Sequence, residues 1–245
     1  LQGVASHSRY KSDLFGRLIG TTQWITITTF GSTKNIYDEA KRVNTMHQHV
    51  RGQFLNKNGE TQEYQASMER FLLWVHCAFT LSFWDCYEVH SPVKNYSADQ
   101  YISQWALSAK PLGLNNAPTS YYELQKLMNE FAVEELTYTA QTKEVVDFIL
   151  NPPFPFFTRL VYRLLANGAI YALPNQFLQI LKIKKQNDFL RYQPTAIRFW
   201  LDSTSHSVFQ HVVPVEPVVF CFSFYINYMT YMCNFFCFFA VSSKL

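Results

Sequence analysis

Glycine and charge are both scarce in this chain. Only 8 of the 245 residues are glycine, and neither glycine-rich phosphate-binding pattern, G-x-x-x-x-G-K-[ST] or G-x-G-x-x-G, occurs. Charged residues make up 16% of the chain, the net charge is +3, and no basic stripe with interleaved aromatic residues is present. We therefore expect no nucleotide-binding loop of these types and no nucleic-acid partner.

Cysteine and the common hydrolase motifs are sparse or absent. The five cysteines are odd in number and contain no C-x-x-C pair, which argues against a zinc ribbon or a disulfide scaffold. We expect them to be small apolar fillers in a reducing compartment. Neither a G-x-S-x-G elbow nor an H-E-x-x-H zinc motif occurs. The cysteines are Cys77, Cys86, Cys221, Cys233 and Cys237.

Apolar and aromatic residues, by contrast, are abundant. Hydrophobic residues make up 48% of the chain and aromatic residues 17%, including 22 Phe and 15 Tyr. This composition excludes a disordered chain, a coiled coil and a collagen-like repeat. Such a chain must line a large core, a slot for a cofactor or lipid, or a membrane.

Spacings of three and four between apolar residues predict a mainly helical chain. In residues 35–50 the stripe runs through Ile36, Ala40, Val43 and either Met46 or His47, and Gly52 is the expected C′ residue. Thr22–Phe30 has the composition of a strand, but a lone strand would lack a partner. The other predicted helices cover 69–83, 156–173 and 189–201 or begin at Ser97 and Thr119, and prolines at 152, 153 and 155 interrupt the pattern.

The end of the chain differs from the rest and suggests a division into residues 1–205 and 206–245. Residues 218–243 contain no Asp, Glu, Lys or Arg, and about 20 apolar residues would span a bilayer. A transmembrane segment is one interpretation; a buried terminal helix and translated intron are the alternatives. Asn227, Asn234 and the shortage of leucine weigh against the membrane. Because the first residue is Leu1, we expect the chain to begin inside a longer product.

Two of the seven histidines lie within apolar helical patterns. His47 lies on the stripe of its helix, whereas His49, two positions on, points about 200° away and cannot share a metal with it. His76 lies within the apolar run 73–78. Each fits a satisfied core histidine, but two buried imidazoles in an aromatic-rich chain also fit a haem or metal site.

Arg17 and Thr21 are spaced to share one helix face. A guanidinium there would hold a haem propionate or polarise dioxygen. The alternative is an ordinary surface arginine in the first turn of a helix.

The order of several short motifs resembles the catalytic domain of the rubber oxygenase (latex-clearing protein) and MpaB oxygenase family. The similarity covers roughly residues 4–205, and its motifs are fairly specific only when taken together. They are His7-Ser8-Arg9-Tyr10, Asp13 to Thr21, Phe30-Gly31, Arg42 to Gly52, Gly59, Tyr64-Gln65-Ala66, Leu73 to His76, Tyr101, Leu112-Gly113, Pro118, and Pro153 to Pro174.

The resemblance implies an all-α fold, globin-like, around a b-type haem, and so a helix at Thr22–Phe30. It makes His47 the iron ligand and matches Arg51 to the arginine that follows this ligand. Our hypothesis adds Arg51 near the haem edge and His76 in support from a second helix. The resemblance places Arg17 and Thr21 on the distal side. Rubber oxygenases have a lysine just before that threonine, where this chain has Gly20.

The missing lysine favours an MpaB-like member and puts rubber itself in doubt as the substrate. The implied activity is oxidative cleavage of an isoprenoid double bond by dioxygen at haem b iron, with a small apolar substrate. The implied location is a membrane, such as the endoplasmic reticulum, or the cytoplasm if the tail is an artefact. The alternatives are a non-catalytic, membrane-associated helical protein and a haem sensor or carrier.

Overall fold

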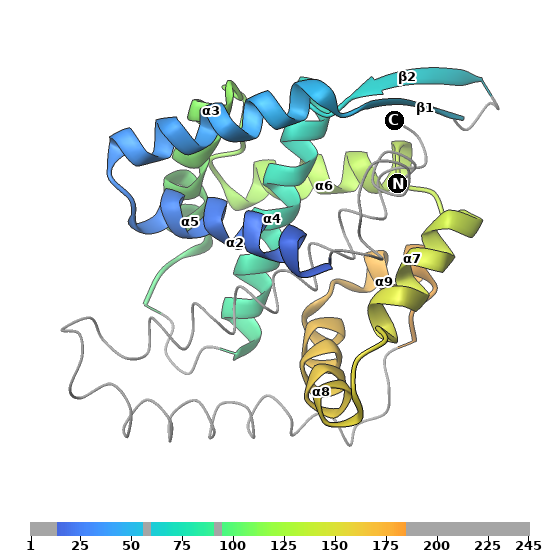
Figure 1. The fold of residues 1–245 in the computed structure, drawn as a ribbon. Coiled ribbons are helices and arrows are strands. Elements are labelled where there is room, and N and C mark those ends of the chain that lie inside the picture. The colour runs from blue at the N-terminus through green and yellow to red at the C-terminus, as the bar shows by residue number, and fades with distance from the viewer. Residues whose placement is uncertain (1–13, 56–59, 91–94, 185–245) are drawn as a thin grey trace.

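The computed structural model describes residues 14–55, 60–90 and 95–184, and within them the chain is mainly helical. The predicted all-α class is confirmed, with one small hairpin added; the arrangement around a haem stays a prediction (Figure 1). The elements are α2 (Leu14–Phe30), α3 (Thr33–His49), β1 (Arg51–Leu55), β2 (Thr61–Gln65), α4 (Glu69–His90), α5 (Ala98–Trp105), η1 (Ala106–Leu112), α6 (Tyr121–Glu134), α7 (Ala140–Leu150), α8 (Phe156–Ala172) and α9 (Asn175–Leu181).

Helix α2 contains the segment whose composition favours a strand. Its threonine hydroxyls bond back along the helix: Thr28 Oγ1 donates to Trp24 O at 2.8 Å and Thr29 Oγ1 donates to Ile25 O at 2.7 Å. A hydroxyl satisfied in this way competes less with the helical backbone. The helix expected from the resemblance is confirmed, and β-propensity alone gives the wrong answer.

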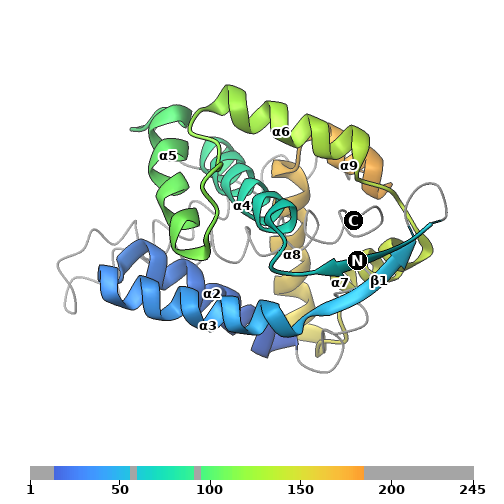
Figure 2. The same ribbon diagram turned by 90° about the horizontal axis from the view of Figure 1, so that it is seen from above.

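Helices α2 and α3 form an antiparallel pair, which lies along one side of the molecule in both views (Figures 1 and 2). Ser32 caps α3, since its side chain accepts the Asn35 N–H. The buried Glu39 joins the two helices: it accepts from Gln23 Nε2 at 3.0 Å and from Arg42 Nε at 2.9 Å. The Arg42 guanidinium lowers the pKa of Glu39, so this carboxylate stays ionised.

The β1–β2 hairpin was not expected, and it corrects the predicted role of Gly52. Helix α3 ends at His49, and Val50 turns the backbone directly into an extended strand. Gly52 is therefore not a left-handed C′ residue; it pairs with Tyr64 across the antiparallel ladder. A Cβ on Gly52 would lie 2.6 Å from Tyr64 Cε1, so the close approach of the ring requires glycine here.

Two glycine substitutions should have opposite effects on stability. A Cβ at Gly20, inside α2, would meet nothing within 4 Å, so Gly20→Ala should raise the free energy of unfolding by about 0.5–1 kcal/mol. Gly52→Ala should lower it, because the methyl group collides with the Tyr64 ring. Urea unfolding of both variants tests the two predictions. A loss of stability in Gly20→Ala would show that a methyl group at this position does not lie in open space.

Helix α4 is the central element of the core and packs against α5, α6 and α8 (Figure 2). Its Trp74 contacts Phe131 of α6 edge-to-face, with the ring centroids 5.0 Å apart. Cys77 and Cys86 are buried free thiols, which confirms the apolar-filler prediction for these two. The other three cysteines lie outside the described residues.

An ion pair joins the start of α4 to the end of α6. Arg70 Nε donates to Glu135 Oε1 at 2.6 Å, and the Arg70 guanidinium also lies 4.0 Å from the centroid of the Phe131 ring. Arg70→Met keeps most of the packing but leaves a buried carboxylate without its cation. We expect a loss of about 2 kcal/mol in unfolding free energy. The same loss in the double variant with Glu135→Gln would show that charge is not the cause.

Most of the remaining predicted boundaries agree with the structure, but α4 continues to His90, well past the predicted end at residue 83. Ser97 caps α5 in a capping box with Gln100, as the sequence predicts for its N-cap. The N-cap of α6 is Ser120, one residue after the predicted Thr119. The proline-rich break separates α7 from α8, and α8 ends at Ala172.

The helix predicted at 189–201, the domain boundary near residue 205 and the apolar segment 206–245 all lie outside the described residues. None of the helices within 14–55, 60–90 and 95–184 combines the length and hydropathy needed to cross a bilayer.

Candidate functional site

His47 lies in the last turn of α3 and is partly buried, while Met46 beside it is exposed. Of the two residues that the stripe prediction leaves open, His47 is therefore the one that faces inward. Its Nδ1 is buried without a hydrogen-bond partner among the described residues. Burial lowers the pKa of His47, so the imidazole is neutral at pH 7. His49 faces solvent, and its Nδ1 lies 2.7 Å from Thr45 O.

His76 is buried in α4 and also has an unsatisfied ring nitrogen. No group in the described part of the chain bonds its Nε2. Burial lowers the pKa of His76 to about 4, which keeps the ring neutral. Its backbone carbonyl accepts a hydrogen bond from Thr80 Oγ1 at 2.7 Å, so the helix around it is well defined.

The β-hairpin holds the two histidine-bearing helices together. Val50 O, at the end of α3, accepts a hydrogen bond from Ala66 N at 3.0 Å, and α4 begins three residues after Ala66. The C-terminal end of α3 therefore lies next to the N-terminal end of α4 (Figure 2). His47 is in the last turn of the first helix, and His76 is about two turns into the second.

The distal candidates, Arg17 and Thr21, lie on α2. Gln23 of α2 is paired with Glu39 of α3 and the helices are antiparallel, so residues earlier in α2 lie opposite residues later in α3. This register places the backbone of Arg17 at the same end of the helix pair as His47. Thr21 is partly buried, and the open space at Gly20 adjoins it.

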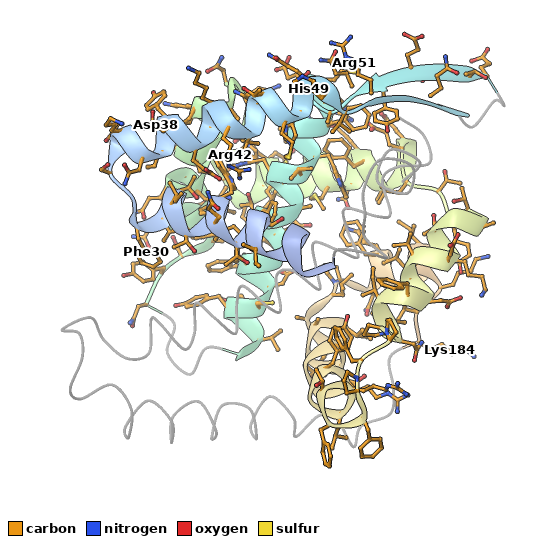
Figure 3. The ribbon with its side chains drawn as sticks, in the orientation of Figure 1. Phe30, Asp38, Arg42, His49, Arg51 and Lys184 are labelled. Atoms are coloured by element: carbon orange, nitrogen blue, oxygen red, sulfur yellow. The ribbon has the colours of Figure 1, made fainter. Side chains whose placement is uncertain are left out.

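Arg51 lies on β1, four residues after His47, and is exposed. Its Nε donates to Gln48 O at 3.0 Å, which ties the guanidinium to the end of α3. Figure 3 shows Arg51 and His49 together at the outer edge of the molecule, where α3 meets the hairpin. The predicted role of Arg51 at the haem edge stays a prediction.

The structure thus places Arg17 and Thr21 on α2, His47 at the C-terminal end of α3 and His76 on α4. No hydrogen bond or ion pair joins the described side chains of Thr21, His47, Arg51 and His76 to one another. Sequence analysis missed the buried Glu39, which positions α3 on α2. The sequence did contain one signal for this role, since Glu39 and Arg42 are three residues apart and can pair on one helix face. Figure 3 shows Arg42 on the side of α3 toward α2.

The two histidines fit a haem better than a metal ion bound by protein ligands alone. No group of three or more His, Cys, Asp or Glu side chains in the described ranges lies close enough to hold an ion. A haem needs only one or two axial donors from the protein, and neutral imidazole is a common one. His47 and His76 each offer a neutral ring with a buried, unpartnered nitrogen.

Comparison with known families gives one result. A family of oxygenase catalytic domains, described as ER-bound oxygenase mpaB/B′/Rubber oxygenase, matches residues 1–199, which is most of the 245-residue chain. No curated protein and no solved structure matches the chain.

Proposed function

We propose, since the chain belongs to the family of ER-bound oxygenases mpaB/B′ and rubber oxygenases, that it is a haem b-dependent oxygenase of apolar, isoprenoid substrates. The observation that carries the haem proposal is His47, a partly buried, neutral histidine whose Nδ1 has no partner among the described residues. Its position matches the family's iron ligand in the resemblance given above.

His47 would hold the iron through one ring nitrogen, because only a neutral imidazole has a lone pair to offer. The depressed pKa keeps that lone pair free of a proton at pH 7. His76 would support the site from α4, again as a neutral ring. When bound, haem supplies the redox chemistry that activates dioxygen.

On the distal side, Arg17 and Thr21 would orient dioxygen and the haem carboxylates. A guanidinium donates several hydrogen bonds to anionic oxygen, and a threonine hydroxyl adds one donor of adjustable direction. Gly20 stands where rubber oxygenases have their lysine, so this position would supply no ligand. The substrate would be held by burial alone, at about 0.8 kcal/mol for each CH₂ removed from water.

The proposed function is tested by loading the full chain with hemin and measuring oxygen uptake. A specific Soret band together with oxygen uptake that depends on an isoprenoid, and with carbonyl products, is the expected result. A Soret band without substrate-dependent uptake would favour a haem carrier or sensor. The absence of specific hemin binding would overturn the proposal.

The missing distal lysine gives a gain-of-ligand prediction. The space at Gly20 admits a side chain, so Gly20→Lys should place an amine beside Thr21 and change the visible spectrum of the hemin complex. Gly20→Ala is the control and should leave the spectrum unchanged. Identical spectra for the lysine and alanine variants would place Gly20 outside the haem pocket.

The family description also supports a membrane location, and we include membrane association in the proposal. An isoprenoid substrate partitions into the bilayer, so an enzyme that binds there meets its substrate at high local concentration.

A further inference from the structure

We propose that the exposed face of α8 is a membrane-binding surface that lies on a bilayer containing anionic lipid. The proposal concerns how the chain meets the membrane, and it rests on the membrane association proposed above. The surface, called here the α8 face, consists of Phe156, Phe157 and Leu160 with Arg159 and Arg163 beside them.

Helix α8 is apolar on two opposite sides, which is unusual for a helix at the edge of a fold. At 100° per residue, Tyr162, Ala166, Ala169 and Ala172 share one side, and all four are buried against the core. The opposite side carries Phe156, Phe157 and Leu160, which are 73%, 81% and 56% exposed. A helix with one apolar side needs one partner, so this second apolar side needs another.

The α8 face begins with two exposed aromatic rings. Phe156 and Phe157 begin the helix directly after the proline-rich break, and their rings contact each other edge-to-face at 5.6 Å. Helix α8 lies at the end of the molecule away from α3 (Figure 1). Large exposed aromatic side chains on a helix face are the kind that insert among lipid headgroups.

The positive charge beside the α8 face favours an anionic bilayer over a protein as the partner that covers this face. Helix α8 has two arginines and no Asp or Glu, and Arg159 and Arg163 lie along one edge of the exposed apolar side. Neither is paired with a carboxylate within the described ranges; Arg159 donates to Phe154 O at 2.9 Å. Arginines that border an apolar helix face are typical of helices that bind anionic lipid surfaces.

Two other candidates could cover the α8 face, the apolar segment 218–243 and a second copy of the chain, but neither brings negative charge to the arginines. The apolar segment 218–243 of this chain contains no Asp or Glu, so it would cover the aromatic rings without meeting the arginines. A second copy of the chain, joined through the same face by a two-fold axis, would bring four arginines together. An anionic bilayer satisfies both the rings and the guanidinium groups.

The test is co-sedimentation of the full chain with lipid vesicles, measured without haem or substrate. We expect binding to phosphatidylcholine vesicles that contain phosphatidylserine, weaker binding to phosphatidylcholine alone, and a decrease with added salt. Phe156→Ser with Phe157→Ser should reduce partitioning by about tenfold or more. Arg159→Gln with Arg163→Gln should remove the preference for phosphatidylserine.

The matched control is Tyr122→Ser with Val133→Ser, which removes two comparably exposed apolar side chains from α6. It should bind vesicles like the wild type. Equal losses in the control and the phenylalanine variant, or no loss in either, would overturn the proposal. So would a wild-type dimer that the phenylalanine substitutions convert to a monomer in gel filtration. Since no haem is used, failure of the oxygenase assay leaves this result intact.

Discussion

Replacing His47 by alanine should abolish specific binding of hemin. The imidazole is the only proposed axial donor on α3, and methyl cannot replace its lone pair. We expect the Soret band of the wild type to sharpen as hemin is added. The His47→Ala variant should bind hemin at least about a hundredfold more weakly, a larger loss of affinity than the removal of a residue that only contacts a ligand causes. Absorption titrations of the two proteins side by side provide the measurement.

His49→Ala is the matched control for this experiment. His49 is on the same helix and two residues away, but it is exposed and its Nδ1 lies 2.7 Å from Thr45 O. This variant should bind hemin like the wild type. If His49→Ala abolishes binding and His47→Ala does not, the assignment from the resemblance and from the apolar stripe is wrong.

A change of fold would not explain the loss in His47→Ala. The Nδ1 of His47 has no hydrogen-bond partner in the described structure, so the substitution removes an unsatisfied polar atom and leaves no donor or acceptor stranded. Circular dichroism and urea unfolding should therefore differ little between the two proteins. A large loss of stability in His47→Ala would mean that the ring is an ordinary core residue.

The sequence predicts most of the helices, because their periodicity is set by the core. The apolar stripe of α3 narrows the buried position to Met46 or His47, and the run around His76 predicts a buried histidine. Caps and prolines add the helix ends, as at Ser97 and the break before α8. These signals are local, so one sequence suffices to find them.

The features that sequence analysis missed depend on contacts between distant segments. Nothing near Gly52 shows that it will face Tyr64, twelve positions on, so a helix-ending glycine was the natural interpretation. The helical state of Thr22–Phe30 depends on packing and on hydroxyl bonds to the backbone, which outweigh β-propensity. The role of Glu39 requires Gln23 to be placed opposite it.

Two groups with strongly shifted pKa values, His76 and Asp85, should have opposing effects on the pH dependence of stability. Burial lowers the pKa of His76 to about 4, and burial raises the pKa of Asp85 to about 7, with a smaller contribution from the nearby Glu88. Asp85 Oδ2 has no hydrogen-bond partner among the described residues. Tyr121 of α6 also lies within range of its charge.

The signs follow from which state holds the proton. Between about pH 4.5 and 6.5 the unfolded chain protonates His76 and the folded chain does not, so this residue makes stability rise with pH. In the same interval the folded chain keeps the proton on Asp85 and the unfolded chain has lost it, so that residue makes stability fall with pH. Each contribution amounts to about 2 kcal/mol over the interval. In the wild type they oppose each other.

Single substitutions should therefore expose each contribution. Relative to the wild type, Asp85→Asn should gain about 2 kcal/mol of unfolding free energy as the pH rises from about 4.5 to 6.5, and His76→Gln should lose a similar amount. The double variant should return to the wild-type slope. The partly buried His47, whose pKa is also lowered, is common to all four proteins and cancels in the comparison. Urea unfolding at several pH values gives the slopes, and parallel curves for all four proteins would show that neither group is as buried as the fold implies.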